Sequence, residues 1–596
     1  MAYRTLKVCI DDLRHTRQLI EFDEEVDPYL ELAAVQRRLY ATESPAVLFT
    51  RPKGCRFPML ANLFGTEKRV EYIFRDGIEP LRKAIQWGAD PLQSRLELSP
   101  SFGMSGWFSR PKFVRRAPVL ACRTTLDQLP QLVSWQQDGG AYLTLPQVYT
   151  EDPDYPGINR SNLGMYRVQI SGNDYLPQLE AGLHYQIQRG IAAHHAAALR
   201  NGKPLRVNVF IGGAPAMMLA AVMPLPEGFS ELRFAGILGR HRIPLVTYYQ
   251  DTLAFPDSVE KSLPIYAEAD FCLTGWLDHG KVKPEGPFGD HLGYYSLQHD
   301  FPVFRVENVF HRKDAVFPFT VVGRPPQEDT QFGKFIHRLV GDVVSKKIPG
   351  VRAVHAVDAA GVHPLLLAKG RESYLPLDPD RRVAELHTLA HAILGYGQLS
   401  LTKYLFLAAE EDDPSLSVYD TARFLQHVLQ RVEWREDIHF ITKTTADTLD
   451  YTDSELNRGS KLFVAASGKP RRQLADSLPE SLPAKNPRLA IPGVLCAEEI
   501  DLHGTFPDEI PLIVLVDDPA ETASSLRNFL WTTFTKSDPA SDVHGIGEFI
   551  ENKHWGCTGA LVINARRKPH HPPELVELPE IARRAEEIVE KILRQV

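Results

Sequence analysis

Apolar and polar positions in the first part of the chain follow helical spacing in some segments and extended spacing in others. The apolar positions of Glu31–Tyr40 recur at helical intervals, which predicts a helix, and Ala46–Thr50 predicts a short strand. Ser99–Arg116 is rich in proline, arginine and serine, a composition typical of a connector. Together these segments predict an N-terminal α/β domain over residues 1–118.

The pattern becomes largely extended between residues 119 and 312. Apolar side chains at Val207, Val209 and Ile211 occupy every second position, as on a half-buried strand. Further strands are predicted at Phe271–Leu277 and Phe301–Phe310. A second domain, rich in strands, is therefore expected over residues 119–330.

Helices and strands alternate in the next part of the chain. Phe335–Lys347 has helical spacing and is expected to connect the strand-rich region to the next domain. Ala384–Leu394 then predicts a helix, Tyr404–Ala409 a strand, and Tyr419–Val432 another helix. This alternation predicts an α/β layer over residues 331–467.

Residues 468–596 form a C-terminal extension. Pro470–Pro487 is polar and contains several prolines, which predicts a loop, and Pro511–Val516 followed by Ala520–Thr533 predicts a strand and a helix. The chain ends in a strongly amphipathic segment, Glu580–Val596. Its apolar positions near one face are Ile581, Ile588, Ile592 and Val596.

Composition narrows the class of protein. A chain of 596 residues is too long for one core, so an α+β protein of two to four domains is expected. The net charge of −8 argues against a general nucleic-acid binder, and no apolar stretch is long enough to predict a membrane span. The N-terminal residues lack a secretory signal, and the six cysteines contain no C-x-x-C pair, so a cytoplasmic protein with reduced thiols is predicted.

Two short segments combine the residue types that acid–base chemistry needs. Asn162 and Arg167 lie five residues apart, and Glu285 and Asp290 lie five residues apart on a loop with one proline and two glycines. An arginine that bridges two carboxylates keeps one of them ionised and lets the other titrate separately. Such a trio can hold a substrate carboxylate and then deliver a proton. Phosphate-binding glycine loops and the H-E-x-x-H and G-x-S-x-G motifs are absent from the sequence.

Five segments in order along the chain point to one family. They are NLGMYRVQ (162–169), MPLPEGFSE (223–231), FAGIL (234–238), EGPFGDHLGYY (285–295) and GRPP (323–326). They resemble the UbiD family of decarboxylases, which depend on prenylated flavin mononucleotide, and the resemblance runs from about residue 20 to about residue 450.

The resemblance implies a fold and an activity. It implies a central split β-barrel that binds the flavin, and a C-terminal α/β domain with elements that hold a homodimer or higher homo-oligomer together. The terminal helix therefore has two interpretations that stay open, packing on its own domain or joining subunits. The implied activity is non-oxidative decarboxylation of an aromatic, heteroaromatic or α,β-unsaturated carboxylic acid, with the cofactor made by a separate flavin prenyltransferase.

The resemblance also assigns catalytic roles. Arg167 would clamp the substrate carboxylate, Glu285 would keep the arginine oriented, and Asp290 would donate the proton. Many family members carry glutamate at the last position, so the shorter aspartate must come nearer the substrate. His291, which is the next residue, either tunes Asp290 or is a surface or core histidine, and it is left outside the catalytic set.

The cofactor residues come from the same alignment. A divalent manganese or magnesium ion is expected on Asn162, Gln188 and Glu231, and the cofactor set also allows a potassium ion. Gln188 stands where the family has histidine; an amide oxygen can bind a hard cation, and His184 is the alternative ligand if that segment is helical. The residues expected at the flavin are Asn162, Met165, Tyr166, Arg167, Gln188, Ala221, Val222, Met223, Pro224, Glu231 and Lys403, the last of which would reach the phosphate.

Three other functions stay open at this stage. In the reverse direction the same residues would make the protein a carboxylase. A narrower interpretation is a decarboxylase of menaquinone or ubiquinone biosynthesis, which rests only on chain length. An interpretation from a different class is a non-catalytic UbiD-like assembly subunit, for which the glutamine at Gln188 is the only support.

Overall fold

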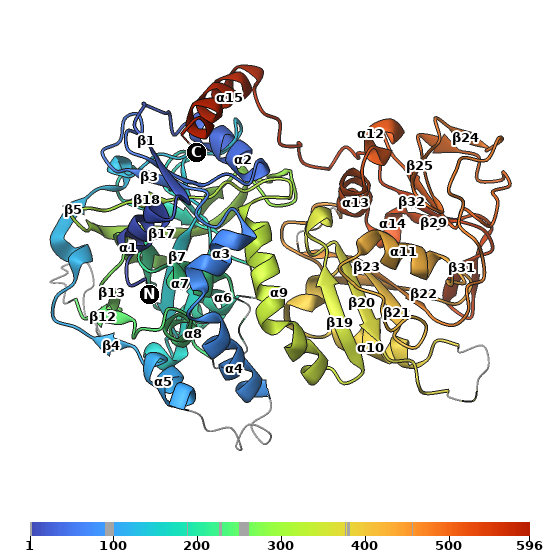
Figure 1. Cartoon of the computed structure of the whole chain (residues 1–596), viewed down its shortest axis with the longest axis horizontal. Coiled ribbons are helices and arrows are strands. Elements are labelled where there is room, and N and C mark those ends of the chain that lie inside the picture. The colour runs from blue at the N-terminus through green and yellow to red at the C-terminus, as the bar shows by residue number, and fades with distance from the viewer. Residues whose placement is uncertain are drawn as a thin grey trace. The chain divides into compact units, whose positions relative to one another are not determined.

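The computed structural model describes residues 3–89, 100–186, 189–223, 225, 229–248, 262–375, 377, 382–453, 455 and 457–595. The chain divides into two compact units, and many of their elements are labelled in Figure 1. Unit 1 consists of residues 1–290, 294–339 and 574–596, and unit 2 consists of residues 291–293 and 340–573. The predicted extension over residues 468–596 is thus shared between the units.

A small four-stranded sheet opens unit 1. Parallel pairing of β1 with β2 and antiparallel pairing of β2 with β3 give the order β1-β2-β3-β18. Thr5 and Thr66 begin two of the nearby helices, and each side chain accepts a hydrogen bond from a backbone N–H of the first turn. The elements are α1 (Leu6–His15), β1 (Leu19–Phe22), α2 (Glu31–Ala41), β2 (Ala46–Phe49), β3 (Met59–Ala61), α3 (Glu67–Phe74), α4 (Ile78–Ala89) and β18 (Phe317–Pro318).

The centre of unit 1 is a nine-stranded sheet dominated by one long hairpin. Its order is β6-β9-β10-β17-β14-β11-β7-β8, with β5 also paired to β17, and the described strands do not close into a barrel. β14 and β17 are long because Phe271–Glu285 pairs along most of its length with His299–His311. The other strands are β5 (Cys122–Thr124), β6 (Tyr142–Leu143), β7 (Pro146–Glu151), β8 (Ser161–Gly164), β9 (Val168–Gln169), β10 (Glu180–Leu183) and β11 (Leu205–Ile211).

Short helices and minor strands complete unit 1. The buried faces of β11 and β14 belong to one apolar core that also includes residues of α2 and α15. The remaining elements are α5 (Pro100–Phe108), β4 (Lys112–Phe113), α6 (Gly190–Arg200), α7 (Pro215–Val222), α8 (Glu231–Leu238), β12 (Pro244–Val246), β13 (Ile265–Tyr266), β15 (Phe288–Gly289) and β16 (Tyr295–Ser296).

Unit 2 contains two five-stranded sheets. The first has the order β19-β20-β21-β23-β22 and the second the order β25-β26-β28-β32-β29, each with a parallel centre and antiparallel edges. Parallel strands that are buried on both faces have near-continuous apolar sequences, as in β21 and β28. The first sheet's elements are β19 (Val351–Ala356), β20 (Leu365–Gly370), α10 (Glu385–Leu394), β21 (Tyr404–Ala409), α11 (Thr421–Leu429), β22 (Ile438–Thr445) and β23 (Arg458–Ala466), and α9 (Glu328–Lys347) leads into them.

The second sheet is formed by the extension. Its elements, with those of two small two-stranded sheets, are β24 (Ala484–Lys485), β25 (Arg488–Ile491), β26 (Val494–Ala497), β27 (Glu499–Ile500), β28 (Leu512–Leu515), α12 (Pro519–Ala523), α13 (Leu526–Thr535), α14 (Pro539–Asp542), β29 (Val543–Gly545), β30 (Glu548–Glu551), β31 (His554–Cys557) and β32 (Leu561–Asn564).

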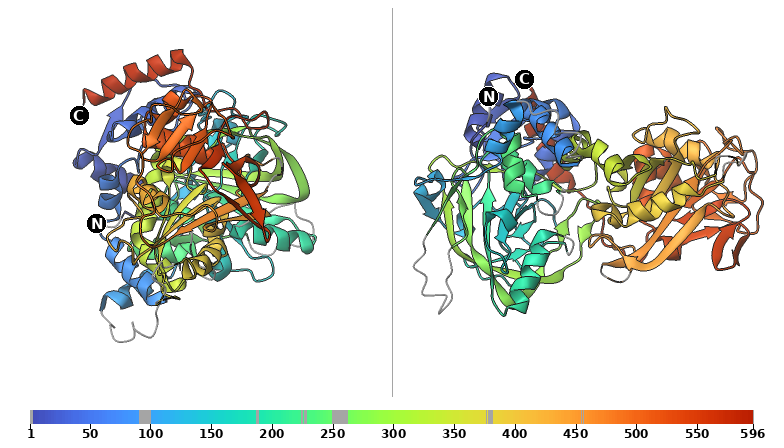
Figure 2. Two further views of the ribbon diagram at one scale, coloured as in Figure 1. Left: turned by 90° about the vertical axis from the view of Figure 1, so that its right-hand side faces the viewer. Right: turned by 90° about the horizontal axis from the view of Figure 1, so that it is seen from below.

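The terminal helix α15 (Pro579–Leu593) returns to unit 1. It packs against α2, and both views in Figure 2 place it beside the N-terminal elements. Ile588 and Ile592 are fully buried in the unit 1 core, and Glu577 just before the helix forms ion pairs with Arg37 and Arg38. The helix therefore packs within its own chain, though not on the extension that precedes it.

Most predicted elements exist, and the connector needs correction. The predicted helix at Glu31–Tyr40 is α2, and the strand at Tyr404–Ala409 is β21. The supposed connector Ser99–Arg116 contains helix α5 and strand β4. Proline is tolerated in the first turn of a helix, so Pro100 begins α5 rather than excluding it.

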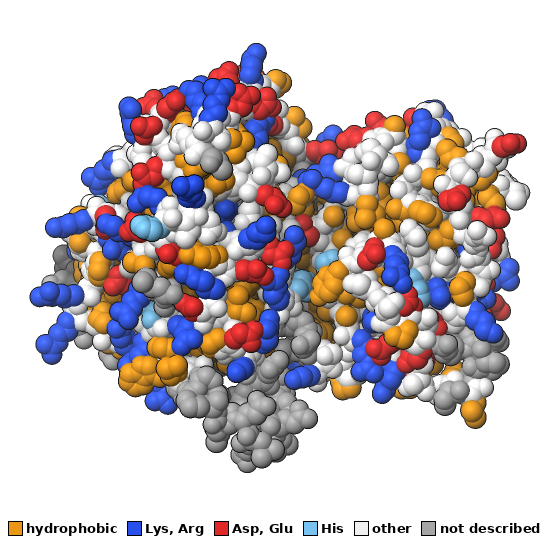
Figure 3. Space-filling model, in the orientation of Figure 1, with side chains coloured by type: hydrophobic (Ala, Val, Ile, Leu, Met, Phe, Trp, Pro, Cys, Tyr) orange, Lys and Arg blue, Asp and Glu red, His pale blue; other side chains and the backbone are white. Residues whose placement is uncertain are grey.

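Three general properties of the described chain concern its surface charges, its cysteines and its helices. Basic and acidic side chains are interspersed on the face drawn in Figure 3. All six cysteines are free thiols. Among the described residues, no helix has both the length and the apolar character that crossing a membrane requires.

Candidate active site

Arg167 and Glu285 form a two-point ion pair in unit 1. Nε of Arg167 donates to Oε1 of Glu285 at 2.9 Å, and Nη2 donates to Oε2 at 2.8 Å. The Arg167 side chain is 9% exposed and the Glu285 side chain 0%. Two parallel hydrogen bonds fix the plane of the guanidinium, so the arginine has one orientation in this site.

Asp290 lies on the other side of the same guanidinium. Nη1 of Arg167 donates to Oδ2 of Asp290 at 2.5 Å, and Nη2 also donates to Oγ of Ser296 at 2.9 Å. The ring of Phe288 lies 4.7 Å from the guanidinium carbon. The structure thus brings together the three residues that the sequence placed in one site, while their catalytic roles stay predictions.

The carboxyl groups of Glu285 and Asp290 differ in their electrostatic environment and in their exposure. Burial disfavours the ionised form of Glu285, but Arg167 outweighs it and holds the Glu285 pKa below its ordinary range. Burial likewise opposes the charge on Arg167, and the charge of Glu285 and its hydrogen bonds raise the Arg167 pKa in spite of it. Asp290 receives one hydrogen bond from the arginine where Glu285 receives two, and its side chain is 11% exposed, so it is the more accessible acid.

Polar side chains of β9 and of the turn that follows it hold the loop that carries both acids. Gly286 has φ +91°, a conformation that favours glycine, and its N–H donates to Oε1 of Gln169 at 3.0 Å. Nδ2 of Asn173 donates to the Gly286 carbonyl at 2.8 Å and to the Pro284 carbonyl at 3.0 Å. Gln169 is the last residue of a motif noted in the sequence, whereas nothing in the sequence singled out Asn173.

Asp138 holds the other end of this loop. Its Oδ1 accepts from the Gly289 N–H at 2.8 Å, and its Oδ2 accepts from the Ser134 and Trp135 N–H groups at 3.0 and 2.9 Å. Burial raises its pKa to about 7 against the effect of these donors. Sequence reasoning missed this residue, because Asp138 becomes relevant only when the fold brings it to Gly289.

His184 lies beside the trio. Its backbone N–H donates to the Arg167 carbonyl at 3.3 Å. Its ring packs edge-on against the ring of Phe301, with 4.1 Å between the ring centroids. Burial and the nearby Arg167 lower its pKa to about 4, so the imidazole is neutral. His184 is not in a helix, which removes the premise on which it was an alternative ligand; Gln188 lies outside the described residues.

Asn162 on β8 lies near Glu231, the first residue of α8. The Leu163 N–H donates to Oε2 of Glu231 at 3.2 Å, and the Tyr166 hydroxyl donates to Oδ1 of Asn162 at 3.3 Å. Nδ2 of Asn162 is buried without a partner among the described residues. Burial raises the pKa of Glu231 to about 7 and that of Tyr166 to about 12.

These groups fit a hard divalent cation. An amide oxygen and a carboxylate are ligands that manganese and magnesium accept, and a buried carboxylate with no ion pair among the described residues is stabilised by a nearby cation. The site is also tight, because a Cβ placed at Gly190 would lie 2.4 Å from Oδ1 of Asn162.

The other residues expected at the flavin are partly gathered here. The Met165 N–H donates to the Ala221 carbonyl at 2.8 Å, which joins the segment after β8 to the end of α7. Val222 is the last residue of α7 and Met223 comes next, largely buried. Pro224 lies outside the described residues.

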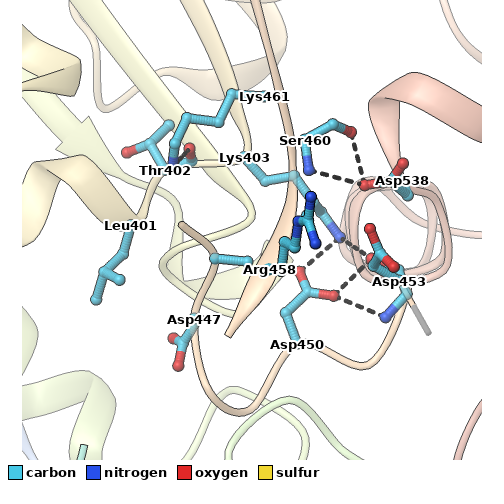
Figure 4. Close-up of a pocket in the computed structure, with 13 residues that line it drawn as sticks. Leu401, Thr402, Lys403, Asp447, Asp450, Asp453, Arg458, Ser460, Lys461 and Asp538 are labelled. Carbon is cyan, nitrogen blue, oxygen red and sulfur yellow. Dashed lines mark hydrogen bonds and ion pairs between the residues drawn. The ribbon is translucent and has the colours of Figure 1, made fainter. Parts of the chain in front are cut away.

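Lys403 lines a small pocket in unit 2. Its Nζ lies 2.7 Å from Oδ2 of Asp450 and donates to Oγ1 of Thr452 at 3.2 Å (Figure 4). The side chain is largely buried, and Asp450 already balances its charge. Lys461 lines the same pocket and donates to the carbonyls of Ser400 and Thr402. The expectation that Lys403 binds a phosphate stays a prediction.

Comparison with protein-family models gives three matches in order along the chain. They are the N-terminal domain (residues 10–87), the Rift-related domain (residues 112–325) and the C-terminal domain (residues 330–466) of 3-octaprenyl-4-hydroxybenzoate carboxy-lyase.

Two curated relatives match almost the whole chain. An uncharacterized protein of Chlamydia trachomatis is 37% identical over 591 residues, which is 96% of each chain. A protein of Chlamydia pneumoniae, named as a subunit of 4-hydroxybenzoate decarboxylase, is 37% identical over 579 residues, which is 94% of each chain.

Solved structures share the fold. Vanillic acid decarboxylase of Sedimentibacter hydroxybenzoicus in its closed form superposes with a TM-score of 0.64 at 22% identity, covering 81% of this chain and 96% of its own. HmfF of Pelotomaculum thermopropionicum, described as a UbiD-class enzyme in complex with FMN, gives a TM-score of 0.57 at 21% identity and covers 80% and 97%.

Proposed function

The chain belongs to the UbiD family of carboxy-lyases, and on that premise we propose that it decarboxylates an aromatic, heteroaromatic or α,β-unsaturated carboxylic acid with the help of prenylated FMN. The observation that carries the proposal is the buried trio of Arg167, Glu285 and Asp290, in which one guanidinium contacts both acids.

A cofactor is needed because loss of carbon dioxide from an sp² carbon leaves an electron pair that no side chain accepts. Prenylated FMN supplies that electron sink when it is bound. In support, FMN and prenylated FMN are present in solved forms of HmfF. The residues that would hold the cofactor and its divalent ion are, among those described, Asn162, Met165, Tyr166, Arg167, Ala221, Val222, Met223, Glu231 and Lys403, with Gln188 and Pro224 as further candidates.

The chain's own residues divide the reaction between them. Glu285 occupies Nε and Nη2 of Arg167, so it keeps the arginine charged and oriented. Nη1 donates to Asp290, so protonation of Asp290 weakens that contact and frees the N–H for the substrate carboxylate. The bond between the ring or alkene carbon and the carboxylate breaks, carbon dioxide leaves, and the electron pair left on that carbon takes the proton of Asp290.

The names of related proteins suggest which acids to test first. They include a 4-hydroxybenzoate decarboxylase subunit, a vanillic acid decarboxylase and a 3,4-dihydroxybenzoic acid decarboxylase. All three substrates are hydroxylated benzoic acids, and we infer that this class is the best starting panel. The reverse reaction, carboxylation, uses the same groups, so the assay is run in both directions with bicarbonate. The test also includes a quinone-precursor acid.

The experiment uses the full chain, co-expressed with a flavin prenyltransferase. We expect a coloured protein that retains the cofactor and catalyses exchange of deuterium from solvent into the decarboxylated product. Replacing Asp290 by Asn should lower that exchange by about 10²–10⁴-fold while the cofactor stays bound. Glu307→Gln, an acid on the same central sheet whose ion pair is with Arg206, is the matched control and should keep the exchange.

Two outcomes would contradict the proposal. Unchanged exchange in D290N would remove Asp290 from the proton-transfer role. A colourless protein without cofactor after co-expression would favour the non-catalytic assembly subunit. Light scattering on the same preparation measures the number of subunits, for which we expect a homodimer or higher homo-oligomer.

A further inference from the structure

We propose that His291, His363 and Asp447 form a binding site for a divalent transition-metal ion of the zinc type. Two imidazoles and one carboxylate offer ligand atoms that all lie within 4.8 Å of one another. All three residues belong to unit 2, so the site is separate from Asn162 and Glu231 in unit 1. This proposal does not depend on the proposed decarboxylase activity.

The three ligands come from three loops that are far apart in the sequence. His291 lies in the short segment 291–293 that belongs to unit 2, His363 lies just before β20, and Asp447 comes after β22. Loops at the ends of sheet strands are common places for binding residues, because a rigid scaffold positions them. The set therefore could not be recognised as a spaced motif in the sequence.

Packing fixes the segment that carries His291. The indole Nε1 of Trp531 donates to the Leu292 carbonyl at 2.7 Å. The side chain of Leu292 lies against Gly361, where a Cβ would come within 2.4 Å of the leucine Cδ2. Gly361 has φ +87°, so glycine suits this position for both conformation and space. These contacts hold the backbone of residue 291 close to the loop of His363.

Hydrogen bonds orient the other two ligands. Nδ1 of His363 and Oδ2 of Asp447 are hydrogen-bonded, and the Leu449 N–H donates to Oδ1 of Asp447 at 3.1 Å. The Asp447 side chain is 4% exposed and that of His363 is 19% exposed. The backbone N–H of Lys403 donates to the His363 carbonyl at 3.2 Å. Metal ligands are usually supported by such outer contacts.

The Asp447 carboxylate forms a hydrogen bond with His363. Asp447 also lines the neighbouring pocket together with Lys403 and Asp450, yet Figure 4 shows its carboxylate pointing away from the Lys403–Asp450 pair. The carboxylate is directed instead to His363, and the ring of His291 meets the ring of His363 edge-on at 6.4 Å. A nearly buried negative charge beside two imidazoles is an arrangement that a dication stabilises.

The geometry and ligand types select the class of ion. Zinc binds imidazole nitrogen at about 2.0–2.1 Å, so tetrahedral ligand atoms lie roughly 3.3 Å apart, a spacing that the three side chains, whose ligand atoms lie within 4.8 Å of one another, reach by rotation. Two histidines and one carboxylate suit zinc and its neighbours better than magnesium or calcium, which prefer oxygen. One or two coordination positions remain for water. Coordination would replace the hydrogen bond between His363 and Asp447.

A second histidine pair in unit 2 provides a matched control. Nε2 of His387 on α10 lies 3.1 Å from Nε2 of His439 on β22. Among the described residues this pair does not extend to a third ligand within the same spacing. If proximity of imidazoles alone captured the ion, this pair would bind it too.

An ion at this site has a structural consequence for the acid loop. His291 is the residue after Asp290 in the chain, and Asp290 contacts Arg167. Coordination of His291 would fix the peptide that carries the Asp290 carbonyl. Metal binding is therefore expected to protect the Gly289–Gly293 segment against amide hydrogen exchange.

The experiment measures metal binding on the full chain after removal of metals with a chelator. Zinc is titrated by calorimetry and cobalt(II) by visible absorption, since cobalt with imidazole ligands at low coordination number absorbs more strongly than cobalt held by oxygens alone. We expect the wild-type protein to give this strong cobalt spectrum. His291→Ala, His363→Ala and Asp447→Asn should each weaken zinc and cobalt binding at least tenfold, whereas His439→Ala should not.

Circular dichroism establishes that each variant is folded. If a change at the buried Asp447 prevents folding, the metal affinity of H291A tests the proposal instead. The proposal is overturned if the wild-type protein shows no strong cobalt absorption. It is equally overturned if H291A and H363A keep the wild-type affinity, or if H439A is the variant that loses the ion.

Discussion

Replacing Arg167 by Met removes the charge and the donors of the arginine while keeping a long side chain. Glu285, whose side chain is 0% exposed, then loses the cation that balances it, and Asp290 loses its contact with Nη1. Removing one partner of a buried pair costs about 3–5 kcal/mol, because the remaining charge stays desolvated. We therefore expect the free energy of unfolding of unit 1 to fall by about 3–5 kcal/mol near pH 8.

The loss should depend on pH with a defined sign. In the wild type the Glu285 pKa lies below its ordinary value of 4.5, so its contribution is fully present above pH 4.5 and is lost as the pH falls through the folded pKa. In the variant, burial without Arg167 raises that pKa, so the penalty is largest at high pH and disappears as the pH falls toward 4.5. The difference between the two proteins should therefore shrink steadily from pH 8 to pH 5.

The assay is denaturant unfolding followed by near-ultraviolet circular dichroism across this pH range. Lys7→Met is the control, because both side chains of its ion pair with Asp314 are exposed (56% and 44%) and the pair should be worth about 1 kcal/mol or less. The double variant R167M/E285Q removes the stranded charge and should recover at least about half of the lost stability. A loss below about 1 kcal/mol in R167M, or a loss that does not change with pH, would refute the reasoning.

Three further predictions concern the surroundings of the site. Gly190→Ala should displace the Asn162 amide, since the new Cβ would lie 2.4 Å from Oδ1, and should lower the flavin and metal content of purified protein, measured by absorbance and elemental analysis. Asn173→Ala removes two hydrogen bonds to the loop around Gly286 and should lower kcat by about tenfold with little change in KM, in steady-state kinetics. Ile588→Ala should destabilise unit 1 by about 2–5 kcal/mol in denaturant unfolding, because the side chain is fully buried against the N-terminal layer; a loss below about 1 kcal/mol would contradict that packing.

Periodicity in the sequence predicted the elements whose burial is simple. The alternation at Val207, Val209 and Ile211 corresponds to β11, and the helical spacing of Phe335–Lys347 lies within α9. The segment Ala520–Thr533 was predicted as one helix and is two, because Ser525 caps a second helix within it. Local signals of this kind do not reveal pairing over long distances, so the length of the β14–β17 hairpin was not predicted.

The candidate site was predictable only where its residues lie in short motifs. Arg167 and Glu285 stand in segments that resemble a known family, and the structure pairs them. Asp138 and Ser296 contribute through contacts that only the folded chain creates, with Gly289 and Arg167 respectively. An aspartate or a serine is common along any sequence, so nothing there marks these two as residues of the site.

Because α15 packs on α2 but is synthesised much later, the α2 surface is exposed during translation. The α2 surface that α15 covers is made early, but about 540 residues separate the end of α2 from the start of α15. At 5–20 residues per second, that surface waits about 30–110 s for its partner. A nascent or truncated chain therefore exposes an apolar stripe near its beginning, which makes this stripe the natural target for a chaperone during synthesis.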